Sequence, residues 1–167
     1  MSRFLYLMRH AQSADKQPGQ PDKERELTQQ GVQDAMLAGK YLQHQKINLD
    51  LLLCSTAVRA NRTAELIIES INLDSNKVQF EDELYTASVR TFLALITQLD
   101  DSAGSVMCIG HNPVISYLAE LLTKAEIGDM PPAAMTIIRF NANHWKDVHQ
   151  GTGEFISILT PEQFKNA

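Results

Sequence analysis

The chain has 167 residues, of which 15 are lysine or arginine and 20 are aspartate or glutamate, and its formal net charge is −5 at pH 7. Its length is that of one domain, residues 1–167, which buries enough surface to fold without a disulfide or a structural metal. The hydrophobic fraction of 44% is typical of a globular protein and too high for a disordered one. The acidic balance argues against a general nucleic-acid-binding protein, although it leaves room for one local basic pocket.

The cysteines and the N-terminal residues indicate the cellular compartment of the protein. Cys54 and Cys108 each lie inside an apolar run, and no Cys-x-x-Cys spacing is present, so we expect two buried thiols in a reducing compartment. The apolar run before Arg9 is shorter than a signal-peptide core, and no apolar run reaches the length of a membrane span. We therefore expect a cytoplasmic protein that has no membrane partner.

The first part of the chain predicts a strand, a long loop and a helix. Residues 4–8 form a short apolar run without helical length, which indicates a buried strand. Residues 12–26 contain two prolines, a glycine and several charges, which indicates a loop, and long loops in compact domains are usually functional or mobile. Thr28 offers a helix N-cap, and apolar residues at helical spacing continue from there to about His44.

The rest of the chain alternates between strand and helix patterns. Strands separated by helices predict an α/β fold with a mainly parallel sheet. The last two strands are joined through a polar segment, and they could pair as a hairpin or lie at a sheet edge. The predicted strands are residues 51–54, 78–80, 105–109, 135–140 and 154–159, and the predicted helices are residues 57–71, residues 89–96 and a helix with Pro113 in its first turn.

Polar side chains follow three of the predicted strands. The first strand is followed by Arg9 and His10, the second by a helix that carries Arg59 and Arg62, and the third by His111. In open α/β sheets, ligands bind beyond the carboxyl ends of the strands, where helix N-termini add backbone N–H groups. The sequence therefore predicts an anion site at this edge of the sheet, with Arg62 as an optional third arginine, and the set of donors suits phosphate.

Each of these residues also has an ordinary explanation. A single histidine after a strand is usually a turn or surface residue, and a single arginine on a helix is usually solvated or ion-paired, so only the joint placement favours a site. We expect His44, His144 and His149, which lack such a placement, to be exposed polar residues. Few carboxylates accompany the other two histidines, and metal-ligand spacings, a Walker loop and a dinucleotide fingerprint are absent, so we expect no metal and no cofactor.

Four motifs stand in order along residues 5–113. They are Leu-Tyr-Leu-Met-Arg-His-Ala at 5–11, Leu27-Thr28-x-x-Gly31, Ser55-x-x-x-Arg59-Ala60-x-x-Thr63 and Gly110-His111-Asn112-Pro113. Together they resemble the histidine phosphatase superfamily, and the short chain with its Gly-His-Asn-Pro motif is most similar to the SixA-type phosphohistidine phosphatases. The resemblance implies a phosphoglycerate-mutase-like fold, which is a three-layer α/β/α sandwich with a mainly parallel central sheet.

The resemblance also implies roles for four residues. His10 would be the nucleophile that becomes phosphorylated, while Arg9, Arg59 and His111 would hold the phosphoryl group. This chemistry is reasonable because a neutral imidazole is a good nucleophile near pH 7, provided that its other nitrogen is held by a hydrogen bond to the backbone. Arginines bind phosphoryl oxygens bidentately and stay charged, so the positive charge is supplied without a metal.

The sequence departs from the family pattern at one position and leaves a second one open. Ala11 replaces the glycine that usually follows the histidine. Many members use a glutamate to protonate the leaving oxygen, and the candidates here are Glu81, Asp82 and Glu83, of which we choose Glu83. The alternative is that this segment is an exposed acidic turn.

These observations lead to one main function hypothesis and two alternatives. The main one is a metal-independent phosphatase that acts on phosphohistidine in a protein partner, such as a histidine-phosphotransfer domain. Phosphohistidine leaves as weakly basic imidazole and needs little acid catalysis, and a chain of 167 residues leaves little material for a cap over the site. The alternatives are a small-molecule phosphomonoesterase with Glu83 as general acid, and a non-catalytic phosphate-binding module, which only Ala11 invites.

Overall fold

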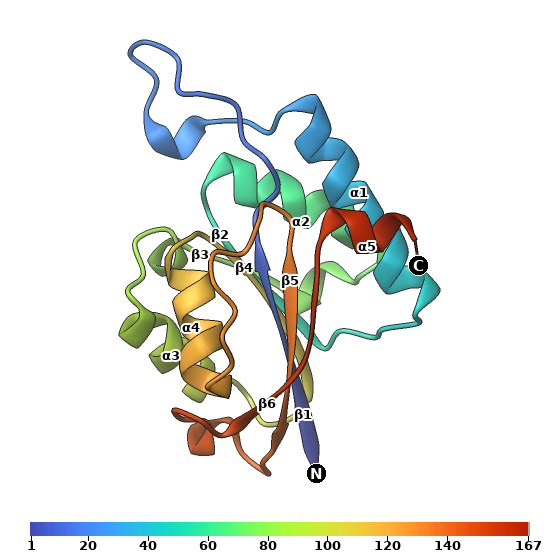
Figure 1. Ribbon diagram of the computed structural model, residues 1–167, viewed down its shortest axis with the longest axis vertical. Helices are drawn as coiled ribbons and strands as arrows, with labels where there is room; N and C mark the ends of the chain where they lie inside the picture. Colours follow the sequence, from blue (N-terminus) through green and yellow to red (C-terminus); the bar gives the residue numbers. More distant parts are fainter. Residues whose placement is uncertain (167) are drawn as a thin grey trace.

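A six-stranded sheet forms the centre of the computed structural model, which describes residues 1–166 (Figure 1). Its strands lie in the order β3-β2-β4-β1-β5-β6, and all neighbouring pairs among the first four are parallel. β5 runs antiparallel to both β1 and β6, so the last two strands form a hairpin pair with β6 at the edge. The strands are β1 (Ser2–Arg9), β2 (Leu51–Ser55), β3 (Val78–Glu81), β4 (Ser105–Gly110), β5 (Met135–Asn141) and β6 (Gly153–Leu159).

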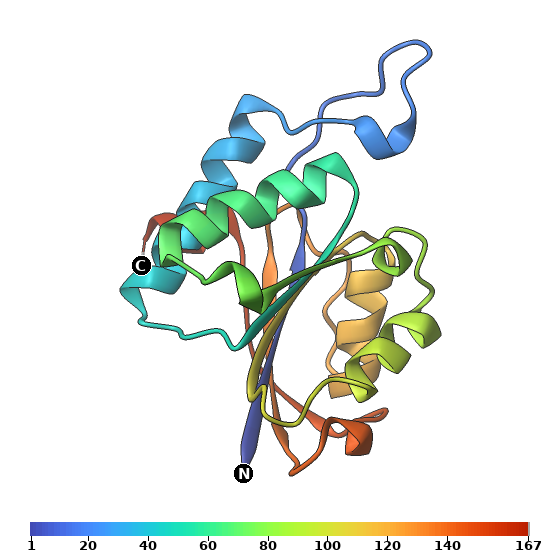
Figure 2. The same cartoon turned by 180° about the vertical axis from the view of Figure 1, so that it is seen from behind.

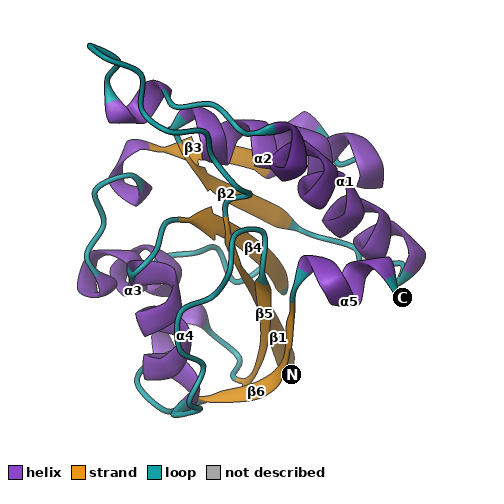
Figure 3. Ribbon diagram, turned by 45° about the horizontal axis from the view of Figure 1, so that its top comes forward, coloured by secondary structure: helices purple, strands orange, loops and turns teal. Residues whose placement is uncertain are grey.

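Helices cover both faces of the sheet (Figure 3). One face packs against α1 (Gln29–His44), α2 (Val58–Ile71) and the short α5 (Pro161–Lys165), and the other against α3 (Val89–Thr97) and α4 (Val114–Thr123). The predicted three-layer sandwich with a mainly parallel sheet is therefore confirmed. None of the helices formed by residues 1–166 combines the length and the hydrophobicity that a bilayer crossing requires.

The two cores follow from the alternation of side chains along the central strands. Leu5 and Leu7 of β1 face the core under α3 and α4, whereas Tyr6 and Met8 face the core under α1 and α2. Because both faces are covered, the strand reads as a continuous apolar run. The two cysteines, in β2 and β4, are fully buried as expected, and burial raises the pKa of both thiols.

The predicted elements are found with small shifts at their ends. Pro113 lies one residue before α4 and caps it, rather than standing in its first turn. Residues 12–26 form a loop as expected, and this loop includes a 3-10 turn at Asp22–Glu24 and a bridge between Ser13 and Leu27. α5 was not among the predicted elements, because five residues are too few to show a helical period.

A close backbone approach fixes the start of α1. Thr28 is the N-cap as predicted: its Oγ1 accepts a hydrogen bond from the Gly31 N–H at 3.0 Å, while its own N–H donates to the Gln12 carbonyl oxygen at 3.0 Å. A Cβ atom on Gly31 would lie 2.2 Å from that carbonyl oxygen. The glycine therefore lets the helix pack directly on the base of the loop.

Replacing Gly31 with alanine should lower the free energy of unfolding by about 2 kcal/mol, because the overlap with backbone outweighs the helix preference of alanine. Denaturant unfolding of the purified chain measures this change. Gln33→Ala, an exposed substitution in the same helix, is the matched control and should stay within about 0.5 kcal/mol of the wild type. Equal stability of the two variants would contradict the steric argument.

Candidate active site

The ends of three parallel strands bring the predicted side chains together. Arg9 is the last residue of β1 and lies opposite Gly110 at the end of β4, and the His10 N–H donates to the Gly110 carbonyl oxygen at 3.1 Å. His111 follows β4, and its ring centroid lies 5.0 Å from that of His10. Arg59 enters from the first turn of α2, where it is buried. The predicted convergence of these four residues is therefore what the structure shows.

His10 is held in one tautomer by the backbone. Its Nδ1 lies 2.7 Å from the Ala11 carbonyl oxygen, and because a carbonyl only accepts, Nδ1 carries the proton and Nε2 keeps a lone pair in the neutral ring. Only 7% of the residue is exposed, and this burial, together with the charges of Arg59 and Arg9, lowers the pKa of His10 to about 4. The ring is therefore neutral at pH 7. The predicted backbone hydrogen bond is confirmed.

Ala11 occupies the family's usual glycine position without strain. Its φ angle is outside the left-handed region that favours glycine. Its side chain is fully buried in the core under α1 and α2. Its N–H donates to Thr63 Oγ1 at 3.0 Å, and the Thr63 hydroxyl in turn donates to the Arg59 carbonyl oxygen at 2.8 Å. The methyl group therefore fits the site, and the hydrogen bond to Thr63 connects the motif at residues 5–11 to the motif at residues 55–63.

His111 is anchored through a buried serine. Its Nε2 lies 2.7 Å from Ser55 Oγ, and this oxygen also accepts a hydrogen bond from the Ala57 N–H at 3.2 Å. Burial, followed by the neighbouring His10 and Arg59, lowers the pKa of His111 to about 3. Its Nδ1 is buried and has no hydrogen-bond partner within the protein.

Arg9 presents a second buried nitrogen without a partner. Its Nη1 donates to the Met130 carbonyl oxygen at 2.9 Å, but its Nε is buried without a partner, and burial lowers the pKa of the guanidinium. Among residues 1–166, three buried side-chain nitrogens lack a partner, and two of them belong to Arg9 and His111. Unpaired buried donors are costly, so this cluster is built to receive acceptor oxygens.

The sequence analysis missed two residues that the structure adds to this cluster, Asp22 and Tyr85. Arg59 donates from Nη1 to the Asp22 carbonyl oxygen at 2.8 Å and from Nη2 to Asp22 Oδ2 at 3.0 Å. The Tyr85 hydroxyl donates to the same Oδ2 at 2.8 Å, and its ring packs edge-on against His111 with the centroids 5.6 Å apart. The Tyr85 hydroxyl and the guanidinium groups of Arg25 and Arg59 hold the pKa of Asp22 well below its usual range. The only feature of the sequence that pointed to Asp22 was the length and charge of the 12–26 loop, and no feature pointed to Tyr85.

The acidic segment after β3 lies at the rim of the site. Glu83 is exposed in a 3-10 turn, Asp82–Leu84, and it takes part in none of the ion pairs formed by the described residues. Its neighbour Asp82 accepts hydrogen bonds from Thr56 Oγ1 at 2.6 Å and from Lys23 Nζ at 3.0 Å. The structure thus shows an exposed acidic turn, and a role for Glu83 as general acid stays a prediction.

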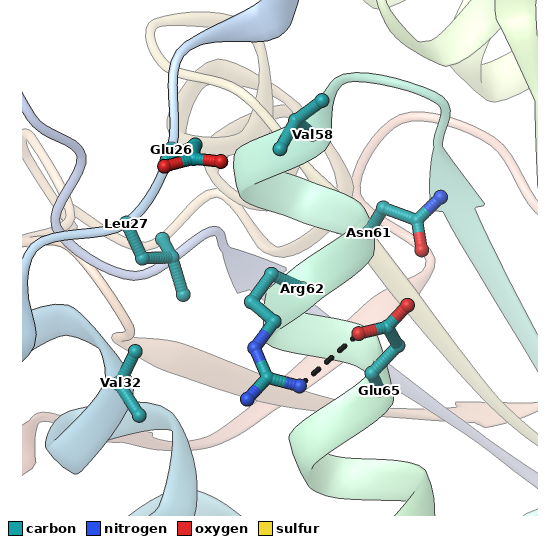
Figure 4. A pocket seen from close by; sticks show the side chains of 7 residues that line it. All are labelled: Glu26, Leu27, Val32, Val58, Asn61, Arg62 and Glu65. Carbon is teal, nitrogen blue, oxygen red and sulfur yellow. Dashed lines mark hydrogen bonds and ion pairs between the residues drawn. The ribbon is translucent and has the colours of Figure 1, made fainter.

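Arg62, the optional third arginine, lies apart from the cluster. Its Nη1 is 3.2 Å from Glu65 Oε2, on the side of α2 that borders α1 (Figure 4). The two residues line a separate groove of about 490 Å³, together with Glu26, Leu27, Val32, Val58 and Asn61. The three histidines expected to be surface residues, His44, His144 and His149, are exposed.

The low pKa of His10 predicts a pH-dependent stability. Between about pH 6.5 and about pH 4 the unfolded chain binds a proton at this residue while the folded chain does not, so the free energy of unfolding falls as the pH falls. We expect His10 to account for a loss on the order of 1–2 kcal/mol between about pH 7 and pH 5. Denaturant unfolding of His10→Asn at both values should show a smaller loss than the wild type. The exposed His149→Asn serves as control, and equal losses in all three proteins would contradict this prediction.

Comparisons with known proteins agree with this geometry. The family model of the Histidine phosphatase superfamily (branch 1) matches residues 5–85. Rv1276c of Mycobacterium tuberculosis (strain H37Rv) is 30% identical over 164 residues, covering 92% of this chain and 99% of that protein. Phosphohistidine phosphatase SixA of Escherichia coli (strain K12) is 28% identical over 133 residues, covering 79% of this chain and 80% of SixA.

The likeness extends to three dimensions. The structure of the protein histidine phosphatase SixA complexed with tungstate superposes with a TM-score of 0.82 at 26% identity, covering 96% of this chain and 98% of that one. The two chains therefore share their fold over almost their whole length. The chain belongs to the histidine phosphatase superfamily, and it is a phosphatase similar to SixA.

Proposed function

We propose that this chain is a metal-independent phosphatase that removes the phosphoryl group from phosphohistidine on a protein partner, through a phosphorylated His10. One observation carries the proposal. The buried, neutral His10 is fixed by the Ala11 carbonyl group with its proton on Nδ1, beside the unpartnered donors of Arg9 and His111. A nucleophile with a free lone pair and a set of anion-binding donors thus share one small site.

Four side chains divide the work in this proposal. Arg9 and Arg59 bind phosphoryl oxygens and neutralise their charge, which is most of what phosphoryl transfer asks of a protein. In this proposal the Ser55 hydroxyl, which accepts from the Ala57 N–H and lies 2.7 Å from His111 Nε2, donates to that nitrogen, so that the proton of the neutral His111 ring is on Nδ1. That N–H then serves as a donor to the phosphoryl group.

The reaction proceeds in two transfers. His10 Nε2 attacks phosphorus, a new N–P bond forms, and the N–P bond to the substrate imidazole breaks. The leaving imidazole is neutral because it keeps the proton on its other nitrogen. Water then attacks the phosphorus on His10, which releases dihydrogen phosphate and restores the neutral His10 ring with its proton on Nδ1.

Two features support phosphohistidine on a protein as the substrate. Glu83 is exposed, and an imidazole leaving group needs little help from a general acid. The relative SixA is itself named a phosphohistidine phosphatase, and the fold of this chain is similar to that of SixA over almost its whole length. A phosphorylated histidine-phosphotransfer domain or a similar protein is therefore the partner that we propose.

A radiolabelled phosphohistidine protein should transfer its phosphoryl group to this chain in a rapidly quenched reaction. We expect His10→Ala to form no phosphoenzyme and to lose at least about a thousandfold in kcat, because no other group replaces the nucleophile. His44→Ala, an exposed histidine far from the strand ends, is the matched control and should keep full activity. Labelling of the His10→Ala protein would contradict the assignment of the nucleophile.

Substrate preference is tested by comparing kcat/KM on a phosphorylated histidine-phosphotransfer domain with kcat/KM on a panel of small phosphate esters. We expect the protein substrate to be preferred, and we expect Glu83→Gln to change its turnover by less than about twofold, since the imidazole needs no acid. Glu69→Gln, an exposed glutamate near the end of α2, is the matched control and should leave both activities unchanged. Faster ester turnover that Glu83→Gln abolishes would support the small-molecule phosphomonoesterase instead, and absence of turnover with phosphate still bound would support the binding module.

A further inference from the structure

The loop of residues 12–26 extends past the end of the sheet and turns back onto the site. Figures 1 and 2 show it beyond the end of β1, with its 3-10 turn near the start of α2. Its base is fixed, because the Ala14 N–H donates to the Glu26 carbonyl oxygen at 2.8 Å and Ser13 pairs with Leu27. Its far part contacts the body through Asp22 and through Lys23, whose Nζ donates to Asp82 Oδ1 at 3.0 Å, so the position of this part depends in part on what Asp22 contacts.

Asp22 places a carboxylate where two arginines and a hydroxyl group converge. Oδ2 accepts from Arg59 Nη2 at 3.0 Å and from the Tyr85 hydroxyl at 2.8 Å, and Oδ1 accepts from Arg25 Nη1 at 3.2 Å. The backbone carbonyl oxygen of Asp22 accepts from Arg59 Nη1 at 2.8 Å. Of these donors, Arg59 is also one that the proposed function assigns to the phosphoryl group, so the carboxylate and the phosphoryl group share one guanidinium.

The two partners of the ion pair between Arg59 and Asp22 differ in exposure. Arg59 stands in the first turn of α2, where 8% of its side chain is exposed and its guanidinium lies 6.0 Å from the centre of the Tyr85 ring. Asp22 has 44% of its side chain exposed and stands on the loop. Asp22 takes one N–H of each terminal nitrogen of Arg59, the one on Nη1 through its main-chain carbonyl oxygen and the one on Nη2 through its carboxylate. A phosphoryl group that binds at Nη2 therefore competes with the loop carboxylate for this donor.

We propose that Asp22 is an intramolecular competitor, which contends with the phosphoryl group for Arg59 and sets how strongly an anion must bind before it occupies the site. This inference rests on the proposed function, because it takes Arg59 as a phosphoryl-binding residue. Competition of this kind lowers the affinity of every anion by the same factor. Weakly held monoanions such as carboxylates then no longer bind at useful concentrations, while a dianionic phosphoryl group with three acceptor oxygens still displaces Asp22.

A role of Asp22 in orienting Arg59 would also be chemically reasonable, and it predicts the opposite change in phosphate affinity when Asp22 is replaced. If Asp22 oriented Arg59 for the substrate, its removal would weaken anion binding. If Asp22 competes, its removal must strengthen binding above the wild-type level. A merely structural role cannot produce tighter binding, so the sign of the effect identifies the role.

The test is a calorimetric titration of inorganic phosphate into the full chain. Asp22→Asn keeps the shape of the side chain and removes its charge, and we expect it to bind phosphate about fivefold more tightly, which corresponds to about 1 kcal/mol. Asp22→Ala should shift the affinity in the same direction. Asp15→Asn, an exposed aspartate on the same loop, is the matched control for the change in net charge and should stay within about twofold of the wild type.

The outcomes separate this inference from the proposed function. If the wild type binds phosphate and Asp22→Asn binds it equally or more weakly, competition is wrong and the proposed function stands. If Asp15→Asn tightens binding as much as Asp22→Asn does, the effect is one of net charge and competition is again wrong. If neither the wild type nor Asp22→Asn binds phosphate, both the proposed function and the inference fail. A lower KM for the phosphohistidine protein in Asp22→Asn, with the phosphoenzyme still formed, would support competition.

Discussion

The parallel pairing of β1 with β4 is the constraint on which the site depends. Arg9 stands opposite Gly110, and the His10 N–H donates to the Gly110 carbonyl oxygen, so that the rings of His10 and His111 lie 5.0 Å apart. A slip of one residue would turn Leu5 and Leu7 from one core to the other, so the apolar pattern of the strand also fixes the position of the chemistry. The register between β1 and β4 therefore determines both the packing of the interior and the geometry of the site.

Much of the fold and part of the site follow from local patterns in the chain. The strands before Arg9 and His111 are short apolar runs, and polar residues at their carboxyl ends must meet at one edge of a parallel sheet. Asp22 and Tyr85 could not be found in this way, because they stand 63 residues apart and the path of a loop decides their meeting. Arg62 is the opposite case, because its spacing from Arg59 allowed it to join the cluster, yet the structure pairs its side chain with Glu65 beside a separate groove.

The charge of the site is opposite in sign to the net charge of the chain. The protein carries a formal net charge of −5, yet the ends of β1 and β4 and the start of α2 gather two arginines around two neutral histidines. Burial keeps both rings uncharged, which prevents four positive charges from standing side by side. The carboxylate of Asp22 balances part of the remaining charge through its ion pair with Arg59. The same guanidinium group thus contributes to the folded structure and is available to bind an anion.

The hydrogen bond from His10 Nδ1 to the Ala11 carbonyl oxygen has a consequence for how the sequence can vary. Many proteins set the tautomer of a histidine with a carboxylate side chain, which a single codon change removes. Here the acceptor belongs to the main chain, and every amino acid supplies it. Residue 11 is thus free to differ in its side chain, within the space that the core allows, while the imidazole before it keeps its proton in the same place.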